Sequence, residues 1–199
     1  MRRGASEGRD AGSGMTGHAT GRRLPTGKDG SGGGTLPLDR HGPLECQVQR
    51  DHARVRAVVQ RVSAAFVTVA GEEVGRIGRG LCVLLGVTHG DDAAVARTVA
   101  DRLWHLRVFD DHDGVMNRSA ADIGAELLVV SQFTVYGDTS TGRRPSWIAA
   151  ARPEQAEPLV EEVVVALRRL GATVATGRFR TTMAVTLTND GPVTVLIDR

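Results

Sequence analysis

Apolar and polar positions alternate in short stretches over residues 55–199. The stretches 56–62 and 65–69 are rich in β-branched residues and are separated by a Ser-Ala pair, which predicts two strands. A turn at 71–73 then leads into a third short stretch at 74–77. We expect a β-meander at the start of the folded region.

Two continuous apolar runs are expected to be inner strands. Residues 81–87 and 126–130 are almost wholly apolar over the length of one strand, and the second run ends at Ser131. Such runs are typical of strands that are covered on both faces. We therefore expect these two strands inside the sheet.

Two segments have the period of amphipathic helices. In residues 91–106 the apolar positions recur at helical spacing, and Asp91 is the expected N-cap. A second helix is expected to begin at residue 153 or 157 and to end at 170, where Gly171 stops it. Both helices would pack one apolar face against the sheet.

The chain ends with two further strand-like stretches, 182–188 and 193–197. Between them lies Asn189-Asp190-Gly191-Pro192, which predicts a hairpin turn. A Gly-Pro bond in such a turn favours a cis peptide. The complete order of strands and helices predicts an α+β fold, in which mixed β-sheets carry a few helices on one side.

The first part of the chain has a different composition. Residues 1–54 contain 12 of the 25 glycines, no aromatic residue, and nine Lys/Arg against six Asp/Glu. A segment of this kind buries too little apolar surface to offset the entropy lost on ordering. We expect a disordered extension at 1–54 and one folded domain at 55–199, which has 16 basic and 17 acidic residues.

The abrupt change at residue 55 supports a hypothesis about the start of the protein. Val55 is then the true initiator, encoded by GTG and read as methionine, and residues 1–54 are not translated. The alternative is a real basic arm that raises affinity for RNA.

Composition also limits the cellular setting. No apolar run approaches the roughly 20 residues that cross a bilayer, and no signal-peptide pattern follows Met1. Cys46 and Cys82 are too few for a disulfide framework. We expect a cytoplasmic protein without a membrane partner.

Most of the candidate chemical motifs lack the spacing or the context that their chemistry requires. The glycines of 75–80 lead into a strand and not into a helix, so they do not form a dinucleotide site. Asp111 and Asp113 lack the spacing of a calcium loop and suit a hairpin turn. His89 has no second ligand at metal-binding spacing, and Cys82 suits a buried thiol with a raised pKa. We expect neither a metal nor a cofactor.

Two loops remain as candidates. Ser131-Gln132-Phe133-Thr134 follows a buried strand, a position where functional loops are commonly held on a rigid base. Its other interpretation is a polar strand end. The segment 189–194 is the second candidate, and it is equally interpretable as a simple turn.

Taken together, six motifs resemble those of the D-aminoacyl-tRNA deacylases, homodimeric enzymes that hydrolyse the ester between a D-amino acid and tRNA. The resemblance covers residues 55–199. The motifs are Arg56-Ala57-Val58-Val59-Gln60-Arg61-Val62, Gly78-x-Gly80-Leu81, Ser131-Gln132-Phe133-Thr134, Arg144-Pro145-Ser146, Thr176-Gly177-Arg178-Phe179 and Asn189-Asp190-Gly191-Pro192-Val193-Thr194.

The resemblance implies that Ser131, Gln132, Phe133 and Thr134 form the floor of an active site at a dimer interface. Their main-chain N–H groups would stabilise the oxyanion, and the 2′-hydroxyl of the terminal adenosine would assist attack by water. Thr134 as a nucleophile is the alternative for the same loop.

The resemblance also implies a stereochemical filter. Gly191 and Pro192 would enter the pocket of the partner subunit, where their carbonyl groups exclude an L side chain and leave room for a D side chain. Arg61 would hold this loop in place. Glycine has no side chain to exclude, so glycyl-tRNA, such as tRNA-Ala mischarged with glycine, would also be hydrolysed.

Four further residues complete the expected substrate site. Phe179 and Met183 would flank the terminal adenine, unless both belong to the core. Arg144 would contact tRNA phosphates, unless its loop is merely solvated. Trp147 stands where the family commonly has phenylalanine, and Tyr136 where it has a smaller residue, so both bear on the size of the pocket.

A non-catalytic nucleic-acid-binding module on the same fold is the competing function. The intact tetrad and the intact Gly191-Pro192 pair argue against it. Residues 55–199 have a net charge of −1 and therefore also lack the excess of basic residues expected of a general nucleic-acid binder.

Overall fold

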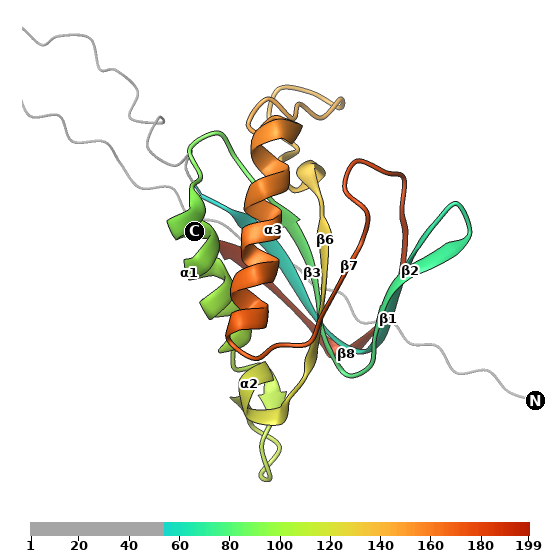
Figure 1. Ribbon diagram of the computed structural model, residues 1–199, viewed down its shortest axis with the longest axis vertical. Helices are drawn as coiled ribbons and strands as arrows, with labels where there is room; N and C mark the ends of the chain where they lie inside the picture. Colours follow the sequence, from blue (N-terminus) through green and yellow to red (C-terminus); the bar gives the residue numbers. More distant parts are fainter. Residues whose placement is uncertain (1–53) are drawn as a thin grey trace, which may run out of the picture. The chain divides into compact units, whose positions relative to one another are not determined.

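The computed structural model describes residues 54–199, so the extension expected at 1–54 lies outside the described residues apart from Arg54. A six-stranded mixed sheet forms the centre of the described region (Figure 1). Its strands are β1 (Arg56–Val69), β2 (Glu72–Ile77), β3 (Gly80–Gly86), β6 (Glu126–Ser131), β7 (Val174–Thr176) and β8 (Ala184–Asp198).

The two strands expected at 56–62 and 65–69 are one strand, β1, of 14 residues. The Ser-Ala pair lies at a shift in register against β8 and does not end the strand. β3 pairs with the first half of β1 and β2 with the second half, both antiparallel. The expected meander of three short strands was therefore wrong in detail, because its first two stretches are one strand, β1, that pairs with β2.

The hairpin expected at the end of the chain was also wrong. Residues 184–198 form a single strand, β8, that pairs antiparallel with β1 from Ala184 opposite Thr68 to Asp198 opposite Arg56. Two steps along β1, from Gln60 to Val62, correspond to five steps along β8. The extra residues, 190–193, form a bulge, and the Gly191–Pro192 peptide within it is cis, as expected.

β3 and β6 are buried on both faces, as the sequence predicts. They are parallel and in register, from Gly80 opposite Glu126 to Leu85 opposite Ser131. Gly80 allows the close pairing, because a Cβ there would lie 1.9 Å from the carbonyl oxygen of Glu126.

Two apolar clusters cover the two faces of these strands. The helices contribute to one cluster, together with residues such as Leu81 and Val83 of β3. The second half of β1, β2 and β8 contribute to the other, which contains Cys82 of β3 and Leu128 of β6. The sheet therefore curves so that its own far end covers the face without helices.

The helices α1 (Ala93–Trp104) and α3 (Pro153–Arg169) lie over one face of the sheet (Figure 1). Asp92, and not Asp91, caps α1, with the Val95 N–H 2.9 Å from its carboxylate. α3 begins at the earlier of the two expected positions, and Gly171 follows its end with a φ of +98°. The predicted α+β class is confirmed.

Three short elements join α1 to β6. They are β4 (Phe109–Asp110) and β5 (Met116–Arg118), which form a two-stranded sheet, and α2 (Ala120–Ile123). The turn expected at 110–114 connects β4 to β5. Within the described residues no helix is long and apolar enough to span a bilayer.

Candidate active site

A cavity of about 550 Å³ opens at the carboxyl ends of β3 and β6. Because the strands are parallel and in register, Leu85 and Ser131 lie side by side there. The first turn of α3 and the segment between β7 and β8 add further walls. The cavity is lined by Leu85, Gly86, Val87, Val130, Ser131, Gln132, Phe133, Trp147, Ala150, Ala151, Pro153, Ala156, Val160, Phe179, Arg180, Thr181, Met183 and Val185.

The Ser131–Thr134 tetrad turns away from the sheet at this cavity. Ser131 is the last residue of β6, and the Gln132 N–H donates to the Leu85 carbonyl oxygen at 2.8 Å. The chain then forms the short 3₁₀ helix η2 (Phe133–Tyr136). Main-chain hydrogen bonds therefore fix the loop to the sheet.

Gly86 allows η2 to lie against β3. A Cβ at this position would lie 2.3 Å from Cγ2 of Val135 and 3.1 Å from the carbonyl oxygen of Gln132. Protein interiors are too closely packed to accept the shorter of these contacts without a shift. The glycine is thus a requirement of the loop position.

The N–H groups of Phe133 and Thr134 stand in the first turn of η2, where a helix supplies no acceptor. Among residues 54–199, no carbonyl outside η2 accepts a hydrogen bond from either group. Gln132 differs, because its N–H is bonded to Leu85. The loop offers two free main-chain donors, which is the kind of group that stabilises an oxyanion.

The part of the cavity lining that the structure describes has no side chain for acid–base catalysis. No His, Asp, Glu, Lys or Cys occurs among its described lining residues. Thr134 accepts a hydrogen bond at Oγ1 from the side-chain amide of Gln132, and within residues 54–199 no hydrogen bond joins it to a base. A hydroxyl nucleophile needs such a base nearby. The geometry favours attack by water over attack by Thr134.

Aromatic side chains lie at the cavity. The rings of Phe133 and Trp147 are packed edge to face, with centroids 5.8 Å apart and an angle of 71° between planes. Phe133 is 58% exposed, which leaves its ring available to a ligand. The Met183 side chain lies against Gly177, because a Cβ on this residue would be only 2.4 Å from the Met183 sulfur.

Arg61 holds the bulge of β8 from inside the protein. The side chain is buried, and its Nε donates to the Asp190 carbonyl oxygen at 3.1 Å. Its Nη1 donates to the Val108 carbonyl oxygen at 2.7 Å and to the Asp110 carboxylate at 3.2 Å. A Cβ on Gly191 would lie 2.7 Å from Nη2. The guanidinium therefore connects the bulge to β4.

Six of the residues predicted from the sequence line the same cavity: Ser131, Gln132, Phe133, Trp147, Phe179 and Met183. Thr134 follows Phe133 in η2 and is not itself part of the lining. Arg61, Gly191 and Pro192 are at the bulge and do not line the cavity. Arg144 is in the loop that precedes Trp147 and does not line it either.

Sequence reasoning missed two parts of the cavity wall. One is the first turn of α3, with Pro153 and Ala156, and the other is Arg180. The signal for Arg180 was its position directly after Phe179 in the sequence. The signal for α3 was weaker, because small apolar residues in a helix are usually core residues.

Burial raises the pKa of two groups that do not line the cavity, Cys82 and Tyr136. Desolvation raises the pKa of the Cys82 thiol to about 11, in agreement with the sequence prediction of a buried, unreactive thiol. Desolvation also raises the pKa of Tyr136, whose hydroxyl donates to the Arg54 carbonyl oxygen. The Arg56 guanidinium lies 4.8 Å from the centre of the Tyr136 ring. The Tyr136 side chain anchors η2 and does not line the cavity.

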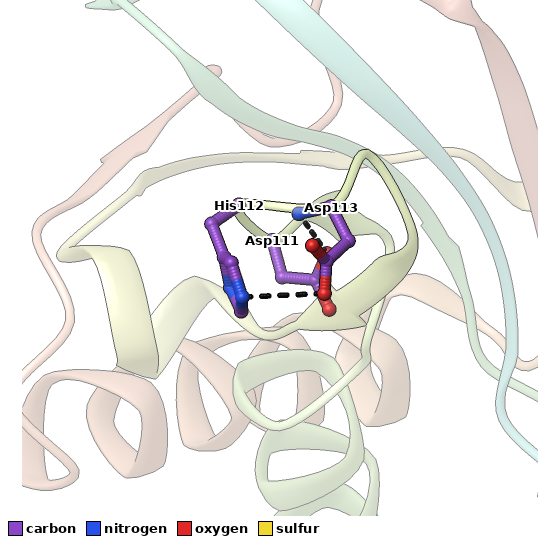
Figure 2. Close-up of side chains that lie close together, drawn as sticks. All are labelled: Asp111, His112 and Asp113. Atoms are coloured by element: carbon purple, nitrogen blue, oxygen red, sulfur yellow. Dashed lines mark hydrogen bonds and ion pairs between the residues drawn. The ribbon is translucent and has the colours of Figure 1, made fainter.

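Asp111, His112 and Asp113 form the group of possible metal ligands that lie within 4.8 Å of one another (Figure 2). The Asp111 carboxylate accepts from the N–H groups of Asp113 and Val115 at 3.0 and 3.1 Å, and these main-chain bonds lower its pKa. His112 Nε2 lies 3.2 Å from the Asp113 carboxylate. The arrangement is that of a hairpin turn stabilised by its first aspartate, as the sequence predicts.

Comparison with protein families identifies the family of this chain. The family model described as D-Tyr-tRNA(Tyr) deacylase matches residues 58–198. The chain therefore belongs to this deacylase family. A D-aminoacyl-tRNA deacylase from Nocardia farcinica is 60% identical over 147 residues, which are 72% of this chain and 99% of that protein. The D-aminoacyl-tRNA deacylase of Thermus aquaticus is 55% identical over 144 residues, which are 72% of this chain and 95% of that protein.

Solved structures give the same fold. A protein named c-Myc DNA unwinding element binding protein has a TM-score of 0.68 and 38% identity, with 71% of this chain and 97% of that chain covered. A structure described as a probable eukaryotic D-amino acid tRNA deacylase has a TM-score of 0.64 and 16% identity, with 73% and 100% covered. At that identity the second likeness concerns the fold alone.

Proposed function

We infer that this protein hydrolyses the ester bond of D-aminoacyl-tRNA and releases the D-amino acid and tRNA. The observation that carries the inference is the cavity at the ends of β3 and β6, with the two free N–H groups of Phe133 and Thr134. Such donors suit the hydrolysis of an acyl ester, because the ester carbonyl oxygen becomes an oxyanion when it is attacked. The 60% identity to a D-aminoacyl-tRNA deacylase supports the same reaction.

In the mechanism that we propose, the ester carbonyl oxygen points to the N–H groups of Phe133 and Thr134. Water attacks the carbonyl carbon, the tetrahedral intermediate forms, and the bond to the ribose oxygen breaks. A single donor of this kind contributes about 10²–10³ in kcat. The 2′-hydroxyl of the terminal ribose accepts a proton from the attacking water and gives its own proton to the departing 3′ oxygen, because the described cavity lining contributes no base.

The stereochemical filter is proposed to come from a second copy of the chain. Gly191 and Pro192 are exposed in the bulge of β8, and Arg61 holds that bulge by its main chain. They do not line the cavity of their own chain. A dimer in which each bulge enters the other cavity would exclude L side chains and admit glycine and D side chains. The free outer edge of β8, which pairs only with β1 among the described strands, is open to such a partner.

A nucleic-acid-binding module is the second candidate function. The 38% identity to a protein named for binding a DNA element favours it. Residues 55–199, however, contain 16 basic and 17 acidic residues, without the positive excess that sequence-independent binding requires. The free donors of η2 also have no task in a module that only binds. We therefore place this function second.

Hydrolysis of three esters tests the proposal. D-Tyrosyl-tRNA, L-tyrosyl-tRNA and glycyl-tRNA are incubated with the protein at concentrations far below those of the esters. We expect turnover of the D and glycyl esters and sparing of the L ester. Tight binding of tRNA or DNA without turnover of any ester would instead support the binding module.

A further inference from the structure

Arg180 is the charged residue among the described residues that line the cavity. Its side chain is exposed and makes no hydrogen bond or ion pair to another residue of the described chain. Arg178, two positions earlier, is paired with Glu72 at 2.9 Å. The two arginines of this segment thus differ, because one cation is neutralised within the protein and the other is not.

The backbone holds Arg180 in an unusual conformation. Its φ of +57° lies in the left-handed region, which residues with a Cβ rarely adopt. The neighbouring Thr181 is fixed by a hydrogen bond from its hydroxyl to the Arg178 carbonyl oxygen at 2.9 Å. A residue other than glycine in this conformation, beside a candidate site, suggests that the residue has a function there.

We propose that Arg180 is a positioning residue that binds a phosphate of the tRNA 3′ end while the ester lies in the cavity. This proposal rests on the proposed function and names how the substrate is held. An esterified amino acid has no free α-carboxylate, and its α-amino group is positively charged. The anionic groups common to all aminoacyl-tRNA substrates are therefore the phosphates, which guanidinium groups bind through paired donors.

The test variant is Arg180→Gly. Glycine adopts a φ of +57° without steric cost, so the variant removes the guanidinium and keeps the fold. With D-tyrosyl-tRNA we expect KM to rise about tenfold and kcat to stay within about twofold, because one charged contact to phosphate is lost. The slope of log KM against log salt should become shallower by about 0.7, the value for one contact to a single strand.

A substrate without phosphate separates this role from a structural one. The ester of D-tyrosine with the 3′-hydroxyl of adenosine has the same reacting bond and the same terminal nucleoside. Arg180→Gly should hydrolyse this ester at the wild-type rate. Arg180→Lys, which keeps a positive charge, should recover part of the loss with tRNA. The matched control is Arg169→Ala, which removes an exposed charge at the end of α3, outside the cavity lining.

Three results would overturn the proposal. The first is an unchanged KM for D-tyrosyl-tRNA in Arg180→Gly. The second is an equal loss with D-tyrosyl-adenosine, which would assign Arg180 to the shape of the cavity. The third is a loss confined to D-aspartyl-tRNA, which would assign it to an acidic amino acid side chain. Failure of the wild-type protein to cleave any D ester would contradict the proposed function instead. The role of Arg180 would then be tested by comparing the affinities of Arg180→Gly and the wild-type protein for uncharged tRNA.

Discussion

The Ser131–Thr134 loop and the bulge at 190–193 both leave a strand, but the protein holds them in different ways. Main-chain hydrogen bonds and the absence of a side chain at Gly86 fix the first. Side chains fix the second: the Arg61 guanidinium donates to the Asp190 carbonyl oxygen, and Asn189 Oδ1 accepts from the Val193 N–H at 3.1 Å. A loop that uses its own N–H groups needs a rigid backbone, whereas a bulge that presents carbonyl groups needs donors from elsewhere.

The largest expected effect concerns Arg61. Arg61→Ala leaves the carbonyl oxygens of Val108 and Asp190 and the Asp110 carboxylate without their donor. Removing one member of a buried polar cluster should lower the free energy of unfolding by about 3 kcal/mol. Urea unfolding measures this change.

Arg61→Lys is the matched control. It keeps the charge but loses most of the donors, so we expect an intermediate loss of stability. A loss below about 1 kcal/mol for Arg61→Ala, the range of a typical single hydrogen bond, would contradict the view that Arg61 is the main side chain holding the bulge.

Gly86→Ala tests the other region. The added Cβ would overlap Val135 and displace η2. A displacement of about 1 Å costs roughly 10²-fold in rate, so kcat for D-tyrosyl-tRNA should fall about 10²-fold. Gly78→Ala is the control, because a Cβ there would meet only Glu126 Oε2 at 3.6 Å. Equal activities of the two variants would show that the loop position does not matter.

Thr134→Val separates a main-chain role from a side-chain role. The substitution keeps the branched shape and the N–H and removes the hydroxyl. We expect kcat to fall less than about tenfold, because the oxyanion donors remain. Single-turnover hydrolysis of D-tyrosyl-tRNA gives the rate. A loss of 10⁴-fold or more, as for a catalytic nucleophile, would restore Thr134 to that role.

The smallest effect concerns the rigid base that both regions share. Cys82 lies in β3, and burial raises its pKa from 9.0 to about 11. The unfolded protein therefore loses this proton at lower pH than the folded protein. The contribution to stability is complete below pH 9 and declines as the pH rises to about 11. Cys82→Ala should show a shallower decline in unfolding free energy over this interval, and parallel curves would contradict the shift.

Much of the fold was predictable because it depends on local pattern. The apolar runs at 81–87 and 126–130 mark inner strands wherever they occur, and Gly171 marks the end of a helix from its immediate neighbours. The single strand β8 was not predictable in this way. Asn189-Asp190-Gly191-Pro192 has the composition of a hairpin turn, and only the pairing of both flanks with the same long strand makes it a bulge.

The site likewise combines residues that a local pattern reveals with contacts that only the complete fold creates. Ser131 and Phe133 lie in one motif and Phe179 in another, whereas Met183 was expected only from the resemblance to the family. Their meeting at one cavity depends on the parallel register of β3 and β6, which no local pattern contains. Arg180 was missed because a single arginine on a loop resembles any solvated residue. Its distinction is the lack of a partner beside an apolar cavity, which exists only in three dimensions.

The missing acid–base residues in the cavity lining also have a kinetic consequence. A lining of apolar side chains, hydroxyls, amides and one guanidinium has no group that titrates between pH 5 and 9. The pH dependence of kcat would then have no bell shape and would reflect the reactivity of the ester itself. A site of this kind selects which esters meet water, and the main-chain donors of η2 accelerate the hydrolysis of an ester bond that is already labile in solution.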